Sequence, residues 1–164
     1  MAEQRLWAPW RMSYVRGERK DEGCIFCLAA EGNDDEARHV LARGERCLVM
    51  LNAFPYNSGH LMTFPRRHVA SIAELDDAEL LELMTLARRA LGALRDVYGP
   101  AGFNLGINEG EVAGAGFAGH VHLHVVPRWA ADSNFMAVTG DTRVLPQSLE
   151  DSYVELRDRF APAP

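Results

Sequence analysis

The chain has 164 residues, of which 48% are hydrophobic and 24% charged, and these proportions are ordinary for one globular domain. The net charge of −6 argues against sequence-independent binding to nucleic acid, which requires a basic surface. No apolar run reaches the roughly 18 residues of a membrane span, and the N-terminus has no signal-peptide pattern. We therefore expect a cytoplasmic protein with neither nucleic acid nor membrane as a partner.

The first third of the chain predicts an N-terminal arm followed by short strands. Residues 1–20 are mixed in character and are expected to form an arm on the protein surface. Two β-type runs, 39–41 and 47–51, flank Arg43-Gly44-Glu45, which is typical of a hairpin turn. A third run over residues 60–64 follows a loop rich in turn residues and is stopped by a proline.

The clearest helical pattern covers residues 77–98. Asp76 and Glu79 have the spacing of a capping box at its start, and Gly99-Pro100 is a stop signal at its end. This spacing predicts a long helix that packs on the core and carries no chemistry. Its apolar residues recur at three- and four-residue intervals, as one buried stripe requires: Leu80, Leu83, Met84, Ala87, Leu91 and Leu94.

The remainder of the chain predicts two more strands and a tail. A strand weakened by glycine is expected over residues 102–108, followed by a Gly- and Ala-rich loop at 109–119 and a strand at 120–127. The C-terminal extension, residues 137–164, is expected to contain a short helix that starts at Ser148. Neither an internal repeat nor a linker divides the sequence, so we expect a single domain.

Three histidines occupy alternate positions in the last strand. With a period of two, His120, His122 and His124 project from one face, while the aliphatic residues between them face the core. The outer two would lie about 13 Å apart on a straight strand, so one metal ion cannot bind all three. An ion could bind two neighbours or one of them, which leaves at least one imidazole for other work. A structural accident is the alternative.

The sequence at this point resembles the histidine triad (HIT) family of nucleotide hydrolases and transferases, whose signature is His-x-His-x-His with apolar residues between. Asn52, His60 and His68 also stand where many members have these residue types. Further segments are similar to the bacterial branch that processes diadenosine tetraphosphate, and the similarity covers nearly the whole chain. These segments are residues 6–12, 127–129 and 132–136.

The resemblance implies an α+β fold of the HIT type. Its parts would be an antiparallel sheet of about five strands, one long helix and one short helix. Family members pair as homodimers with one continuous sheet, so the second expected partner, besides a nucleotide substrate, is another copy of the chain. The implied function is cleavage of dinucleoside polyphosphates at the α-phosphate through a nucleotidyl-histidine intermediate. Water or inorganic phosphate would be the acceptor.

The resemblance also assigns roles to the histidines. His122 would attack the α-phosphorus, because a neutral imidazole is a competent nucleophile near pH 7. Its other ring nitrogen must then carry a proton and donate it to an acceptor such as a backbone carbonyl. His124, on the same face, is placed to donate to the phosphate or leaving group. His60 would support this array, and a purely structural role for His60 is equally open.

Substrate binding is expected to involve the Gly- and Ala-rich loop and two flanking positions. Asn108 and the main-chain N–H groups of Ala115 and Gly116 could bind phosphate, although a flexible loop is the alternative. Some relatives have serine in place of Gly116, so one side-chain hydrogen bond is missing here. Asn52 could bind ribose or stabilise a turn. Trp129 could stack on a base or pack on a partner subunit.

The pair Cys24-x-x-Cys27 has the spacing of half a structural zinc site. The resemblance to zinc-containing HIT proteins supplies the other two ligands, His68 and His120, and a closed four-ligand site is structural. The alternative is two reduced cysteines near a loose N-terminus. The third cysteine, Cys47, lies in an apolar run and is expected to be a buried core thiol.

Three other functions remain open from the sequence. The family includes nucleoside phosphoramidate hydrolases, which differ in the leaving group. A module that binds adenine nucleotides without catalysis is a second possibility. The third is a zinc-dependent hydrolase with its metal on His120 and His122.

Overall fold

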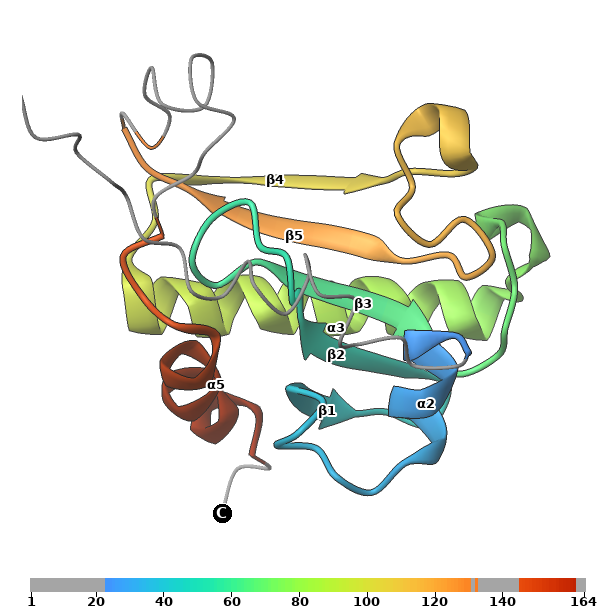
Figure 1. The fold of residues 1–164 in the computed structure, drawn as a ribbon, viewed down its shortest axis with the longest axis horizontal. Coiled ribbons are helices and arrows are strands. Elements are labelled where there is room, and N and C mark those ends of the chain that lie inside the picture. The colour runs from blue at the N-terminus through green and yellow to red at the C-terminus, as the bar shows by residue number, and fades with distance from the viewer. Residues whose placement is uncertain (1–22, 131, 133–144, 162–164) are drawn as a thin grey trace, which may run out of the picture.

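The computed structural model describes residues 23–130, 132 and 145–161 (Figure 1). Within them the chain forms a five-stranded sheet of order β1-β2-β3-β5-β4 in which every neighbouring pair is antiparallel, so the α+β prediction is confirmed. The expected N-terminal arm and residues 133–136 lie outside the described residues. The strands are β1 (Val40–Arg43), β2 (Cys47–Leu51), β3 (Leu61–Pro65), β4 (Gly102–Ile107) and β5 (Leu123–Arg128).

Both faces of the sheet bury apolar side chains, since successive residues of a strand point to opposite sides. On β2, Cys47 and Val49 belong to the larger core cluster, whereas Leu48 and Met50 belong to a second cluster. Every residue of β2 is buried, so this strand reads as a continuous apolar run. Cys47 is fully buried as expected, and burial raises the pKa of its thiol to about 12.

The long helix α3 (Asp77–Tyr98) lies along the larger cluster and has the predicted ends, but Met84, which was expected in its buried stripe, is 52% exposed. The Asp76 side chain accepts from the Glu79 N–H, the Glu79 carboxylate accepts from the Asp76 N–H, and Gly99 ends the helix in the left-handed conformation. The short helix α5 (Leu149–Arg157) starts after Ser148, as predicted, and packs on the same cluster.

The third helix, α2 (Ile25–Glu31), was not predicted from the sequence. Its Phe26, Ala29 and Ala30 are buried in the second cluster, on the face of the sheet opposite α3. Met62 of β3 belongs to that cluster and pairs in register with His124 of β5, so His124 lies on the same face. The candidate site therefore lies on the side of the sheet away from the long helix.

The prediction of a continuous strand over residues 120–127 is wrong for its first residues, because β5 begins only at Leu123. The Val121 N–H donates to the carbonyl of Val69 at 2.7 Å, so the chain there pairs with the loop after β3 instead of with β3 itself. The rings of His122 and His124 are nevertheless neighbours in space. The ring centroids of His122 and His124 are 4.8 Å apart, and Phe26 contacts the rings of both His120 and His122.

No helix in the described part of the chain is long and apolar enough to cross a membrane.

Candidate functional site

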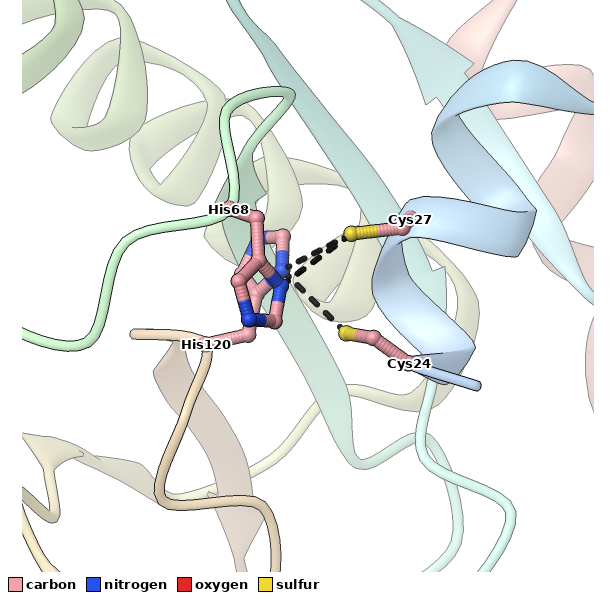
Figure 2. A group of neighbouring side chains, drawn as sticks. All are labelled: Cys24, Cys27, His68 and His120. Atoms are coloured by element: carbon pink, nitrogen blue, oxygen red, sulfur yellow. Dashed lines mark hydrogen bonds between the residues drawn. The ribbon is translucent and has the colours of Figure 1, made fainter. Parts of the chain in front are cut away.

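Four side chains from three parts of the chain converge beside the start of α2 (Figure 2). Cys24 precedes the helix, Cys27 lies in its first turn, His68 follows β3 and His120 precedes β5. The sulfur of Cys24 is 3.3 Å from Nδ1 of His120, and the sulfur of Cys27 is 3.2 Å from Nδ1 of His68. All four ligand atoms lie within 4.8 Å of one another, so the cluster could hold a metal ion.

The donor set fits a zinc site. Zinc bond lengths of about 2.3 Å to sulfur and 2.0–2.1 Å to nitrogen give sulfur–nitrogen separations of about 3.6 Å, and the three close sulfur–nitrogen pairs of the cluster are 3.2, 3.3 and 3.6 Å apart. His120 Nε2 lies 2.9 Å from the Pro65 carbonyl. This carbonyl can only accept, so the ring proton is on Nε2 and the Nδ1 lone pair faces the sulfurs, which is the arrangement of a metal-binding histidine.

The two cysteines would have to lose their protons to bind a cation. Partial burial and the neighbouring Cys24 raise the pKa of the Cys27 thiol to about 11, so without a cation the thiol stays protonated at neutral pH. A bound metal ion reverses this, because a coordinating thiol loses its proton. Two sulfurs and two neutral imidazoles are the ligands of closed structural zinc sites.

His122 is oriented as a nucleophile requires. Its Nδ1 lies 2.9 Å from the carbonyl oxygen of His120, so Nδ1 carries the proton and Nε2 has the free lone pair. The side chain is 4% exposed, and this burial lowers the pKa of the imidazole, which is therefore neutral near pH 7.

His60 and His124 form a hydrogen-bonded pair in which the donor and the acceptor can be identified. The backbone N–H of Tyr56 donates to Nδ1 of His60 at 3.1 Å, so His60 must carry its proton on Nε2. That Nε2 lies 3.0 Å from Nδ1 of His124, which accepts and leaves the His124 proton on Nε2. Burial and the neighbouring His122 lower the pKa of His124 to about 4. His124 is thus a neutral donor next to the His122 ring.

Two residues of the loop before β3 surround this pair. The ring centroid of Tyr56 lies 4.8 Å from that of His60 and 6.0 Å from that of His124. Asn52 accepts the Phe54 N–H through Oδ1 at 2.9 Å, a bond that stabilises the turn, while its amide nitrogen lies 3.4 Å from Nδ1 of His60. Asn52 therefore has the turn role that we had considered as an alternative, and the ribose contact stays a prediction.

The three residues that are expected to bind phosphate, Asn108, Ala115 and Gly116, lie in the loop between β4 and β5. Gly110 and Gly114 have positive φ values of 81° and 88°, a backbone conformation that favours glycine. The Ala115 N–H donates to the Gly110 carbonyl over a long 3.3 Å, so a phosphate would have to replace this bond. Asn108 is half-buried and Gly116 is exposed, and their contact with phosphate stays a prediction.

This loop is also tied to the segment that follows His68. The carboxylate of Glu109 accepts from the Ile72 N–H at 2.6 Å and from the Ser71 hydroxyl at 3.1 Å. No local sequence pattern predicts this contact, because the two segments are far apart along the chain. It fixes one end of the loop next to the segment that carries His68.

Trp129 follows the end of β5 and is half-buried. Its N–H donates to the carboxylate of Asp132, which also forms a bidentate pair with Arg128. These bonds fix the turn, and the role of the indole ring in stacking or packing stays a prediction.

Two aromatic residues of the site were missed by sequence reasoning, Tyr56 and Phe26. Phe26 stands between the two cysteines, and its ring centroid lies 4.7 Å from that of His122. Only the Cys-x-x-Cys spacing could have drawn attention to it.

Comparison with known proteins places this geometry in a family. The sequence matches the HIT domain over residues 33–131. AP-4-A phosphorylase of Mycobacterium tuberculosis (strain ATCC 25618 / H37Rv) is 39% identical over 168 residues, which covers 98% of this chain and 86% of that protein. Adenosine 5'-monophosphoramidase hnt1 of Schizosaccharomyces pombe is 30% identical over 105 residues, which covers 64% of this chain and 74% of that protein.

The fold gives the same result. A zinc-bound histidine triad family protein from Mycobacterium smegmatis is similar with a TM-score of 0.66 at 25% identity, which covers 85% of this chain and 94% of that one. With the domain match, the relatives and the fold in agreement, the chain belongs to the HIT family.

Proposed function

We propose that this protein cleaves dinucleoside polyphosphates such as diadenosine tetraphosphate at the α-phosphate, through a nucleotidyl-histidine intermediate on His122. One observation carries the proposal. The His120 carbonyl binds the Nδ1 proton of a buried, neutral His122, which leaves Nε2 as a nucleophile. The M. tuberculosis relative is named AP-4-A phosphorylase, which supports inorganic phosphate as the acceptor.

The reaction has two displacement steps at the same phosphorus. In the first, Nε2 of His122 attacks the α-phosphorus and the bond to the bridging oxygen breaks, so diadenosine tetraphosphate would release ATP. The Nε2–H of the neutral His124 donates a hydrogen bond to the departing oxygen and stabilises the negative charge on it, without transfer of the proton. In the second, an oxygen of inorganic phosphate attacks the phosphorus and the N–P bond breaks. ADP leaves and His122 is restored.

The negative charge that develops on the phosphoryl oxygens needs preorganised donors. The amide of Asn108 and the N–H groups of Ala115 and Gly116 belong to the loop that leads directly into the histidine segment. They supply these donors in our proposal, with Asn52 at the ribose and Trp129 at the base.

Product analysis tests the proposed reaction. Purified protein is incubated with diadenosine tetraphosphate, with and without inorganic phosphate, and the nucleotides are separated. ADP and ATP formed only with phosphate support phosphorolysis, whereas ATP and AMP without phosphate indicate hydrolysis. His122→Ala should abolish both while nucleotide binding is retained. Unchanged turnover in that variant would exclude the nucleophile assignment, and the absence of any turnover in the wild type would favour a binding module.

A phosphoramidate substrate is the second candidate, because the S. pombe relative is named adenosine 5'-monophosphoramidase. The same His122 chemistry would act on a different leaving group. Comparison of kcat/KM for adenosine 5'-phosphoramidate and for diadenosine tetraphosphate separates the two.

We also propose that zinc is the metal of the Cys24, Cys27, His68 and His120 cluster. With four protein ligands it would act as a structural cross-link. The cross-link would join α2 to the segment after β3 and to the residue that precedes β5. This assignment leaves the His122 ring without a metal, as a nucleophile requires.

The expected homodimer has support at the edge of the sheet. β4 is an edge strand, and its Leu105 is 42% exposed. Glu82 of α3 bonds the β1–β2 turn, so Met84, 200° further around the helix and 52% exposed, lies on the flank toward β4. We propose that a second copy covers this flank. Light scattering should give a dimer for the wild type and a monomer for Leu105→Arg; a monomeric wild type would contradict the proposal.

A further inference from the structure

Phe26 links the Cys/His cluster of Cys24, Cys27, His68 and His120 to the proposed nucleophile, His122. It lies between Cys24 and Cys27 at the start of α2, and its side chain is 1% exposed. Its ring centroid is 4.7 Å from that of His122, with 31° between the ring planes, and 5.0 Å from that of His120. One buried side chain therefore contacts both the nucleophile and a metal ligand.

The hydrogen bonds of His122 do not by themselves fix its ring plane. The bond from Nδ1 to the His120 carbonyl selects the tautomer, but the ring can still tilt about that bond. The His124 ring meets His122 nearly edge-on, with 78° between the planes. Phe26, at 31°, covers a face of the His122 ring, so the plane of the imidazole, and hence the direction of Nε2, depends on Phe26.

The position of Phe26 depends in turn on how α2 is attached. This helix has only seven residues and no side-chain cap at its start, so it needs tertiary contacts. At its C-terminal end, the guanidinium groups of Arg43 and Arg66 donate to the carbonyls of Ala29 and Ala30. At its N-terminal end, where Phe26 lies, the polar side-chain contacts within the described residues are those of the Cys/His cluster.

We propose that Phe26 is a positioning residue for the nucleophilic imidazole of His122, and that metal binding by Cys24 and Cys27 holds Phe26 in that position. The inference rests on the proposed role of His122 and adds the means by which a structural metal site affects the reaction. Two contacts thus connect the Cys/His cluster to His122: the hydrogen bond from its Nδ1 to the His120 carbonyl, and the packing of the Phe26 ring on the imidazole.

The test measures the His122 ring directly. The full-length protein is labelled with ¹⁵N-histidine and loaded with zinc, and two-bond ¹H–¹⁵N correlation spectra report the tautomer and mobility of each ring. In Phe26→Leu we expect His122 to show a tautomer mixture or broadened signals. We also expect kcat to fall by up to about 10²-fold with KM little changed, the size of effect caused by misplaced groups.

Phe64→Leu is the matched control. Phe64 is also fully buried, and its ring contacts Phe26 and His120, but no contact joins it to His122 in the described structure. This variant should lower stability and leave the His122 signals as in the wild type. Equal broadening of His122 in both variants, or in neither, would overturn the proposal.

The metal arm of the test uses the unmodified chain. Removal of zinc with a chelator should broaden the His122 signals in the same way, and added zinc should restore them. Cys24→Ser provides the same state without chelator and keeps Phe26, in case Phe26→Leu does not fold. His122 signals that are unchanged without zinc would overturn the metal link. Full turnover in His122→Ala is a different result, which would refute the proposed function.

Discussion

At the scale of single residues, the direction of each hydrogen bond decides which imidazole nitrogen is free. A backbone N–H at Tyr56 and a backbone carbonyl at His120 cannot exchange roles, so they set the tautomers of the rings they contact. His122 then presents a lone pair and His124 a proton. The sequence predicted three imidazoles on one side, but it could not predict these tautomers, since they depend on bonds made by distant or main-chain atoms.

The first prediction concerns His60, whose Nε2–H donates to Nδ1 of His124 and thereby sets the tautomer of His124. His60→Ala should lower kcat by about 10²-fold, the usual cost of losing one preorganised hydrogen-bond donor, because the His124 proton is no longer held on Nε2. KM should change much less. His39→Ala is the control, because its ring packs on Tyr153 and should be neutral for kcat. Equal kcat values for His60→Ala and wild type would show that His60 is only structural.

The second prediction concerns pH and His124. The pKa of His124, about 4, lies below the value of about 6.5 in the unfolded chain. Between these two pH values the unfolded chain therefore binds more protons than the folded chain. The free energy of unfolding should therefore fall as the pH drops from about 6.5 toward 4, by roughly 1.4 kcal/mol per pKa unit of difference. Urea denaturation from pH 7 to pH 4.5 should give a smaller decrease for His124→Asn. Parallel curves for the two proteins would contradict the low pKa.

At the scale of elements, local signals were sufficient for α3 and insufficient for α2. The capping box and the glycine stop of α3 are local contacts, so both ends of this helix could be predicted from neighbouring residues. The seven residues of α2 have no such signals. Its attachment comes from Arg43, Arg66 and the Cys/His cluster, which are remote in sequence. The start of β5 was misplaced for the same reason, since Val121 pairs with Val69.

The third prediction concerns Glu79 at the start of α3. Its carboxylate is 3% exposed and accepts from Arg67 at 2.7 Å and from the Asp76 N–H at 3.0 Å, and the pKa of Glu79 is lowered to about 2, chiefly by Arg67. Glu79→Gln should reduce the free energy of unfolding at pH 7 by about 1–3 kcal/mol. Asp77→Asn, in the same turn, is the control and should cost a few tenths of a kcal/mol.

The sign of the pH effect provides a second check on Glu79. Because its folded pKa is below the unfolded value of about 4.3, the stabilisation is complete above that value and is lost as the pH falls toward 2. The difference between the wild type and Glu79→Gln should therefore shrink in acid. A difference that does not depend on pH would mean that the ion pair is not its source.

At the scale of the whole molecule, two groups of side chains lie next to each other and have no residue in common. One is the Cys/His cluster of Cys24, Cys27, His68 and His120, and the other is the group of His60, His122 and His124. His120 faces the sulfurs, while His124 contacts both His60 and His122. The resemblance implies the same division, with His120 in the metal site and with His122 and His124 in the reaction. What the resemblance left open was the physical connection between the clusters, which Phe26 makes.

The fourth prediction concerns the metal content of the protein. The wild type should contain about one zinc ion per chain, and Cys24→Ser should contain much less and melt at a lower temperature. Cys47→Ser is the matched control, because Cys47 is buried in the larger core cluster away from the metal cluster. It should keep its zinc, although it loses some core packing. Equal zinc content in the wild type and Cys24→Ser would contradict the four-ligand site.

The proposed reaction depends most on Nε2 of His122 as the atom that bonds to phosphorus. The direct measurement is a rapid quench of the zinc-loaded protein with diadenosine tetraphosphate, without phosphate and into alkali, which preserves phosphoramidates. Tandem mass spectrometry then locates the modified residue. An adenylyl group on His122, discharged as ADP when phosphate is added before the quench, is the expected result. An adduct on His124 or His60, or steady turnover with the His122→Ala variant, would contradict it.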